Sequence, residues 1–120
     1  MTIFSQYSQV TAYTTRDGSQ IRELMHPDSQ GNKQQSLAEA TVTPGEKTLL
    51  HKHLKSEELY FITQGNGKMT LGNTSIEVAN GHCICIPPNT PHNIENTGDI
   101  DLKILCCCSP AYSHNDTELL

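Results

Sequence analysis

Two histidines separated by one residue, His51 and His53, are followed by Glu58 and, 39 positions after His53, by His92. Side chains two residues apart on an extended strand point to the same face, so the imidazoles of His51 and His53 can converge on one point. Imidazole and carboxylate groups bind divalent Fe, Mn, Ni, Zn or Cu and do not by themselves select among them. These four residues therefore outline a metal site.

Glu58 needs a turn before it to join this site. It lies five positions after His53, so on an unbroken strand its carboxylate would point to the opposite face. We therefore expect a turn at 54–57 and a second, antiparallel strand that begins at Glu58. Glu58, Tyr60 and Ile62 would then face the interior. The residues between them, Leu59 and Phe61, would face outward, as would Glu57.

The glycines and prolines around the candidate ligands have a regular spacing over two stretches, 45–65 and 81–96. The first begins at Gly45 and ends at Gly65, and the second contains Gly81, Pro87 and Asn96. Both stretches resemble the two consensus motifs of the cupin superfamily. One departure is Asn89, where the motif usually has glycine, and Asn tolerates the left-handed backbone conformation better than most residues.

The resemblance implies an all-β fold, a single double-stranded β-helix known as the cupin jelly-roll barrel. It also implies that His51, His53, Glu58 and His92 hold one divalent transition metal per chain. Four protein ligands on a six-coordinate metal leave about two positions for other molecules, which is typical of a catalytic or ligand-binding site.

The rest of the chain agrees with an all-β architecture. Short segments alternate with turn dipeptides such as Asp17-Gly18, Pro44-Gly45 and Asn80-Gly81. Many short strands at this spacing are typical of a sandwich or a barrel. We expect one domain over 1–120, a polar loop at 28–35 and a surface-lying C-terminal tail at 109–120. The predicted strands are 9–15, 20–25, 36–42, 48–53, 58–63, 67–71, 75–78, 82–86, 92–95 and 102–107.

Other residues are weaker candidates for the site. Tyr60 shares a face with Glu58 and would be a proton donor or, equally, core filling. Arg22 and Arg16 precede the first motif and would either bind a substrate carboxylate or phosphate or lie on the solvated surface. The remaining histidines, His26, His82 and His114, fall outside the pattern.

Composition excludes several classes of protein. The formal charge is −5, with only eight Lys and Arg, which argues against nucleic-acid binding. No leader-like N-terminus and no apolar run of about 20 residues is present, so a cytoplasmic protein without membrane contact is expected. Five cysteines, an odd number without Cys-x-x-Cys spacing, argue against a disulfide framework. We interpret Cys83, Cys85 and 106–108 as small buried hydrophobes, the alternative being that one approaches the metal as a thiolate or redox partner.

Three functions stay open at this stage. The first is a metal-dependent enzyme that acts on a sugar, sugar phosphate or keto acid by isomerase-like or lyase-like Lewis-acid chemistry. The tail and the run 53–67 are similar to small cupins of the mannose-6-phosphate-isomerase-like type, which fits this hypothesis. The second is an Fe(II) dioxygenase, and the third is a non-catalytic cupin that binds a metabolite or metal. Outward Leu59 and Phe61 favour a homodimer.

Overall fold

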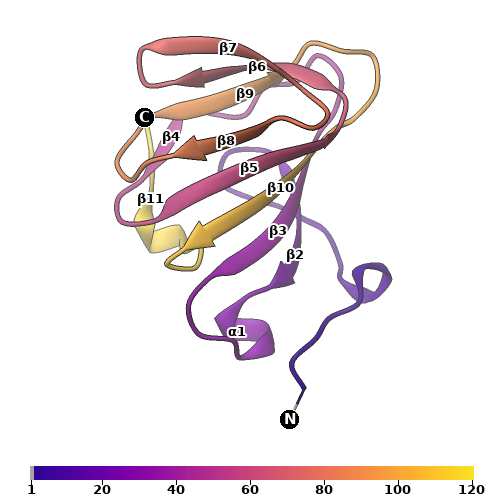
Figure 1. The fold of residues 1–120 in the computed structure, drawn as a ribbon, viewed down its shortest axis with the longest axis vertical. Helices are drawn as coiled ribbons and strands as arrows, with labels where there is room; N and C mark the ends of the chain where they lie inside the picture. Colours follow the sequence, from indigo (N-terminus) through magenta and orange to yellow (C-terminus); the bar gives the residue numbers. More distant parts are fainter. Residues whose placement is uncertain (1) are drawn as a thin grey trace.

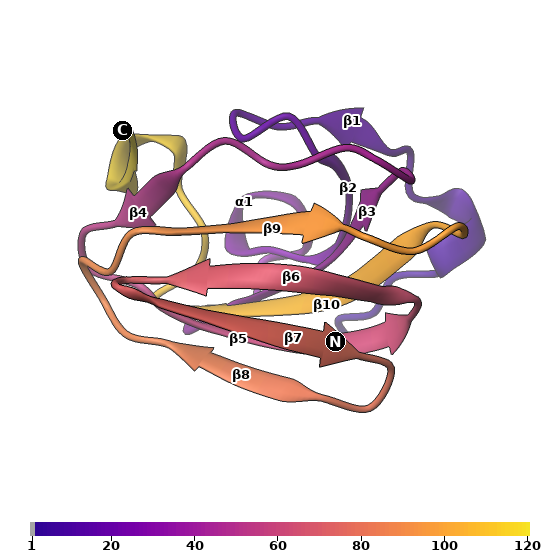
Figure 2. The ribbon, with the colours of Figure 1, turned by 90° about the horizontal axis from the view of Figure 1, so that it is seen from above.

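The protein is described by a computed structural model over residues 2–120, which form two antiparallel β-sheets. One sheet has six strands in the order β1-β2-β3-β10-β5-β8, and the other has five in the order β11-β4-β9-β6-β7. Figure 1 shows the six-stranded sheet running across the molecule, and Figure 2 shows the two sheets stacked as layers. This arrangement confirms the predicted all-β jelly-roll class.

The elements agree closely with the predicted strands from residue 20 onward. Their bounds are η1 Tyr7–Gln9, β1 Tyr13–Thr14, β2 Gln20–Met25, α1 Pro27–Gln30, β3 Ser36–Val42, β4 His51–His53, β5 Glu57–Gln64, β6 Asn66–Leu71, β7 Thr74–Ala79, β8 Cys83–Ile86, β9 His92–Asn96, β10 Leu102–Ser109, η2 His114–Asp116 and β11 Thr117–Leu119.

Alternation along the strands places one face of each sheet in the core. On β5, Glu58, Tyr60 and Ile62 are buried, whereas Leu59 and Phe61 are 41% exposed, as the sequence pattern predicts. On β10, the buried positions alternate in the same way from Leu102 to Cys108. The core cluster consists of Ala40, Val42, Tyr60, Ile62, Met69, Val78, Ile84, Ile86, Ile94, Leu102, Ile104 and Cys106.

Asn89 occupies the left-handed conformation that the second motif requires. Its φ is 62°, and it is the one non-glycine residue with positive φ among residues 2–120. Its backbone N–H donates to the carbonyl of His53 at 2.6 Å. The turn before β9 is thereby fixed against the end of β4, which brings the two halves of the histidine set together.

Four predicted segments are wrong in part. The strand predicted at 48–53 shortens to His51–His53, and residues 48–50 lie outside any strand. The strand predicted at 9–15 shrinks to Tyr13–Thr14, because the 3-10 helix η1 extends to Gln9 and residues 10–12 are irregular. The polar loop at 28–35 begins with helix α1, which the His26 ring caps by accepting the N–H of Asp28. The tail at 109–120 does not simply lie on the surface, because β11 pairs with β4 and buries Thr117.

The cysteines also divide differently from the prediction. Cys106 and Cys108 are buried, as predicted, but Cys83 and Cys85 are exposed. Both exposed cysteines lie on β8, the edge strand of the six-stranded sheet, at positions that pair with the outward residues of β5. All five cysteines are free. Among residues 2–120, no helix is long and apolar enough to cross a membrane.

Candidate metal centre

Three histidines meet inside the molecule, between the two sheets. His51 and His53 lie on β4, and His92 on β9 is the direct cross-strand partner of His51. One ring nitrogen from each lies within 4.8 Å of the other two. All three side chains are buried, His92 completely. The structure therefore brings together the three histidines that the spacing singles out.

Hydrogen bonds fix the orientation of each imidazole. The Nδ1 atom of His51 lies 2.8 Å from the Leu49 carbonyl, and that of His92 lies 2.9 Å from the Thr90 carbonyl. A carbonyl oxygen can only accept, so both Nδ1 atoms must carry the proton and donate. The Nε2 lone pairs of the neutral rings then point into the site, which is the orientation that metal-binding histidines adopt.

Thr117 fixes the third imidazole. Its hydroxyl donates to the Ser113 carbonyl at 2.9 Å, so its oxygen is left to accept the Nδ1 proton of His53 at 3.0 Å. Thr117 is buried and comes from β11, 64 positions after His53. Sequence reasoning missed this residue because the tail carries no metal-ligand motif.

We predict that Thr117→Val weakens metal binding about 10- to 100-fold, the usual effect of removing an outer partner of a histidine ligand. Valine has nearly the shape of threonine but cannot accept the Nδ1 proton of His53. Thr117→Ser keeps the hydroxyl and is the control. Chelator competition with Mn²⁺ or Zn²⁺ measures both variants, and equal affinities for Thr117→Val and wild type would contradict the proposed role.

Glu58 faces two of the inward ring nitrogens. Its Oε1 atom lies 3.1 Å from Nε2 of His53 and 3.6 Å from Nε2 of His92, and its Oε2 atom accepts the thiol proton of Cys108 at 3.3 Å. Burial raises the pKa of Glu58, but hydrogen bonds and positive charge from the two histidines, when their Nε2 atoms carry protons, outweigh that effect and bring the pKa to about 2. The side chain is therefore a buried carboxylate.

The atoms at the centre of this cluster need a cation. Glu58 Oε1 and His92 Nε2 are buried without a hydrogen-bond partner in the described residues. With the Nδ1 atoms donating outward, the neutral rings present lone pairs to a carboxylate oxygen that can also only accept. Either a proton on an imidazole or a metal cation resolves this repulsion. Three nitrogens and one carboxylate oxygen fit a divalent transition metal.

Cys108 is a protonated thiol that donates a hydrogen bond to Glu58. Burial, and next the negative charge of Glu58, raise the pKa of Cys108, so the group stays protonated and donates to Oε2. Burial likewise raises the pKa of Cys106. Without a bound metal, both buried cysteines are therefore thiols.

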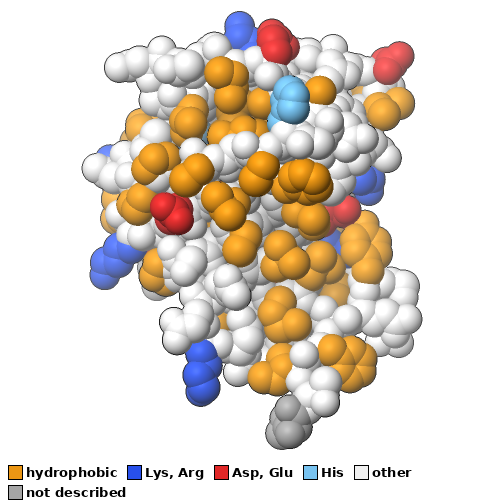
Figure 3. All heavy atoms as spheres, viewed as in Figure 1, with side chains coloured by type: hydrophobic (Ala, Val, Ile, Leu, Met, Phe, Trp, Pro, Cys, Tyr) orange, Lys and Arg blue, Asp and Glu red, His pale blue; other side chains and the backbone are white. Residues whose placement is uncertain are grey.

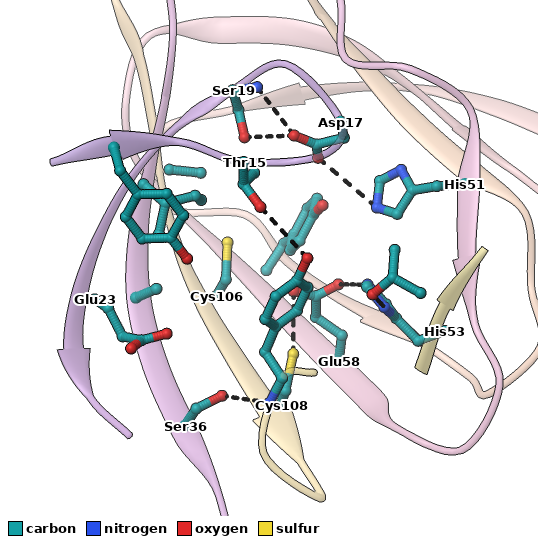
Figure 4. A pocket seen from close by; sticks show the side chains of 17 residues that line it. Thr15, Asp17, Ser19, Glu23, Ser36, His51, His53, Glu58, Cys106 and Cys108 are labelled. Atoms are coloured by element: carbon teal, nitrogen blue, oxygen red, sulfur yellow. Dashed lines mark hydrogen bonds and ion pairs between the residues drawn. The ribbon is translucent and has the colours of Figure 1, made fainter. Parts of the chain in front are cut away.

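A small cavity opens beside the cluster (Figure 4). Its volume is about 50 Å³, which is room for a few water molecules or one small ligand. Among the described residues that line it, none is Lys or Arg. Tyr13, Glu23 and Tyr112 form a wall that it shares with an outer cavity of about 430 Å³. The lining is Tyr13, Thr15, Asp17, Ser19, Ile21, Glu23, Ser36, Ala38, Ala40, His51, His53, Glu58, Tyr60, Cys106, Cys108, Tyr112 and Thr117.

Of the weaker candidates, Tyr60 lies at the cavity and the two arginines do not. Burial, and then the charge of Glu58, raise the pKa of Tyr60, so its hydroxyl keeps its proton. Arg16 donates to the carbonyls of His114 and Thr117 at 2.8 and 2.9 Å and fastens the tail. Arg22 bonds to the Val10 carbonyl and stacks 4.6 Å over the Tyr7 ring, outside the cavity.

The histidines outside the pattern have local structural contacts. His26 is buried, and its Nε2 atom lies 2.7 Å from the Tyr112 carbonyl. His82 accepts the N–H of Ala79 at 3.1 Å on the exposed surface. His114 is exposed and lies 3.0 Å from the Tyr112 hydroxyl.

The two-sheet fold and the histidine cluster define a cupin, and the sequence comparisons agree. The cupin domain family matches residues 38–108, more than half of the chain, and the chain therefore belongs to the cupin superfamily.

Relatives and solved structures extend this result. An uncharacterized protein of Methanocaldococcus jannaschii is 57% identical over 98% of this chain and 94% of its own length. The oxalate-binding protein of Thermotoga maritima is 29% identical over 72% of this chain and 71% of its own length. Oxalate decarboxylase from Bacillus subtilis superposes with a TM-score of 0.85 at 19% identity, over 99% of this chain and 32% of that one. At that identity the superposition shows the fold alone.

Proposed function

We propose that this cupin is a metal-dependent enzyme whose substrate is a small, oxygen-rich metabolite. The observation that carries the proposal is the convergence of three imidazole nitrogens and one buried carboxylate oxygen beside a small open cavity that His51, His53 and Glu58 line. A closed cluster would indicate a structural metal, whereas an open one leaves room for a ligand. His51, His53, Glu58 and His92 would hold one divalent ion.

The cavity favours small substrates of low negative charge. Its volume of about 50 Å³ suits a few heavy atoms, and larger ligands would have to reach into the outer cavity past Tyr13 and Tyr112. The lining supplies carboxylates from Asp17, Glu23 and Glu58 but no Lys or Arg to pair with a phosphate. A keto acid or a hydroxy ketone therefore fits better than a sugar phosphate.

Each protein group around the proposed metal ion would have its own role in the reaction. A bound divalent metal supplies Lewis-acid polarisation of a substrate oxygen. Tyr60 offers a protonated hydroxyl as a donor to the substrate, since burial keeps its pKa high. Ile21, Ala38 and Ala40 contribute apolar side chains to the lining of the cavity. Cys108 holds the second oxygen of Glu58 and thereby keeps Oε1 turned toward the histidines.

Two alternatives remain distinct from this proposal. A non-catalytic binder is favoured by the similarity to the oxalate-binding protein of Thermotoga maritima. An Fe(II) dioxygenase is compatible with the same ligand set, because three imidazoles and a carboxylate also bind iron. The three functions differ in whether product forms and whether oxygen is consumed.

The test uses the full-length protein loaded in turn with Mn²⁺, Fe²⁺, Ni²⁺ and Zn²⁺ under nitrogen. Each form is screened by thermal shift with oxalate, pyruvate, dihydroxyacetone and glucose 6-phosphate, and each binding pair is then followed by NMR for product. Product formation without oxygen supports the proposal. Binding without product supports the non-catalytic alternative. The Fe²⁺ form is then mixed with each ligand it binds in air-saturated buffer, and oxygen uptake there supports the dioxygenase.

We further propose that the chain forms a homodimer through the outer face of β8, β5 and β10. Leu59 and Phe61 lie there beside their cross-strand partners Cys85 and Cys83, and Figure 3 shows apolar side chains gathered over these strands. Since the exposed edge strand β8 borders this apolar face, a second copy would cover both. We expect light scattering at micromolar concentration to give a dimer mass and Phe61→Glu a monomer. A wild-type monomer would contradict the proposal.

A further inference from the structure

A second carboxylate faces the histidine cluster from the N-terminal part of the chain. Asp17 lies in the loop between β1 and β2, and its Oδ2 atom is 3.7 Å from Nε2 of His51 (Figure 4). The side chain is only 12% exposed and lines the inner cavity. Neither motif of the sequence contains this residue.

The loop holds the Asp17 carboxylate in a fixed orientation. Its Oδ1 atom accepts from the backbone N–H and the hydroxyl of Ser19, at 2.9 and 2.7 Å. The Asp17 carbonyl accepts the N–H of Leu49 at 2.8 Å, which ties the loop to the segment that leads into β4. Gly18 permits the tight turn with a φ of 93°. One carboxylate oxygen is therefore anchored, and the other is directed at the site.

Each of the two carboxylates, Glu58 and Asp17, lies close to different histidines of the cluster. Glu58 approaches His53 and His92, and Asp17 approaches His51. Two atoms that each lie about 2.0–2.2 Å from one ion can be no more than about 4.4 Å apart. The 3.7 Å between Asp17 Oδ2 and His51 Nε2 satisfies this limit for that pair. The donor atoms that all lie within 4.8 Å of one another are those of the three histidines, so the Asp17 side chain would have to turn further inward to share their ion. Buried Glu58 Oε1 and His92 Nε2, which have no partner in the described residues, lie in the same cluster.

We propose that Asp17 is an additional metal ligand, supplied by the β1–β2 loop. The inference rests on the proposed metal-binding function and extends it. Five protein ligands leave about one position free on a six-coordinate ion. Two carboxylates neutralise a divalent charge, so the loaded site would favour neutral or singly charged ligands over dianions. A chelating anion such as oxalate would have to displace the Asp17 oxygen.

The test compares Asp17→Asn with Glu23→Gln. Asparagine keeps an oxygen that can accept from Ser19 but replaces Oδ2 with an amide that cannot bind a cation. Glu23→Gln removes the same charge from the opposite side of the cavity, away from the histidines in Figure 4. Metal affinity is measured with Mn²⁺ and Zn²⁺ by chelator competition, and the visible spectrum of the Co²⁺ form reports a change in ligands.

We expect Asp17→Asn to weaken metal binding by at least about 10-fold, to alter the Co²⁺ spectrum and to increase the affinity of the Mn²⁺ form for oxalate. Glu23→Gln should change metal affinity by less than about twofold. An unchanged affinity and spectrum in Asp17→Asn, or equal losses in both variants, would overturn the inference. The His51→Ala variant tests the metal site independently of Asp17. If His51→Ala loses metal while Asp17→Asn keeps it, the metal site is right and only the role of Asp17 is wrong.

Discussion

Replacing His92 by alanine is expected to abolish tight metal binding. His92 is completely buried, and its Nε2 atom lies at the centre of the cluster, without a hydrogen-bond partner among residues 2–120 and 3.6 Å from Glu58. Losing a partner of a ligand typically costs 10- to 100-fold in affinity, so losing the ligand itself should cost more than about 100-fold. Isothermal titration with Zn²⁺ and Mn²⁺ measures the effect.

His82→Ala is the matched control for this experiment. His82 is exposed, and its ring accepts only the backbone N–H of Ala79 among the described residues, so its removal should leave metal affinity unchanged. If His92→Ala does not fold, His92→Gln retains most of the side-chain volume and serves instead. Tight binding by both His92 variants would contradict the assignment, and so would loss of metal from His82→Ala.

Lowering the pH from 7.5 to 5.5 should weaken metal binding by at least about 10-fold. Protons compete with the metal for the inward Nε2 atoms, so affinity falls as these nitrogens become protonated and binding releases protons. The carboxylate of Glu58 does not contribute in this range, because its pKa is about 2. Titrations in two buffers with different ionisation enthalpies count the protons released. A metal affinity that does not fall between pH 7.5 and 5.5 would contradict this prediction.

The stability of the metal-free protein should change with pH in the same direction. Burial, and next the charge of His92, lower the pKa of His51 below its usual 6.5, so the unfolded chain binds this proton more readily than the folded one. The stabilisation is therefore complete above about pH 6.5 and is lost as the pH falls through the folded pKa, at most about 1.4 kcal/mol per pH unit. Urea unfolding after chelator treatment measures it, and His51→Gln should flatten the dependence.

Much of the fold could be predicted because the local signals agree with one another. On β5 the alternation from Glu58 to Ile62 matches the period of a strand, and the buried residues are those that the pattern selects. The gap between His53 and Glu58 required a change of direction, and the chain bends there at 54–55. The predicted antiparallel pairing of the two flanking strands is wrong, because β5 begins at Glu57 and joins the six-stranded sheet, whereas β4 belongs to the other sheet. The histidines could be grouped because two share a strand and the third lies in a second motif of defined spacing.

The remaining features depend on contacts between distant segments. Thr117 reaches His53 only because the tail returns to pair with β4, and no periodicity in a short polar segment indicates that pairing. In the sequence, Asp17 looks like an ordinary turn residue before Gly18. Its approach to His51 depends on the hydrogen bond that holds its loop to Leu49. The segment that contains Cys83 and Cys85 is entirely apolar, as a buried strand would be. It forms the edge strand β8, however, and none of the described residues covers the outer face on which these two cysteines lie.

The most direct test of the central claim is elemental analysis of the wild-type protein, purified without an affinity tag or added metal, beside Glu58→Ala. We predict close to one equivalent of a divalent transition metal in the wild type and a large loss in the variant, because the buried cluster requires a cation. A wild-type protein that contains no metal and takes up none of Mn²⁺, Fe²⁺, Ni²⁺ or Zn²⁺ on reconstitution would contradict the account.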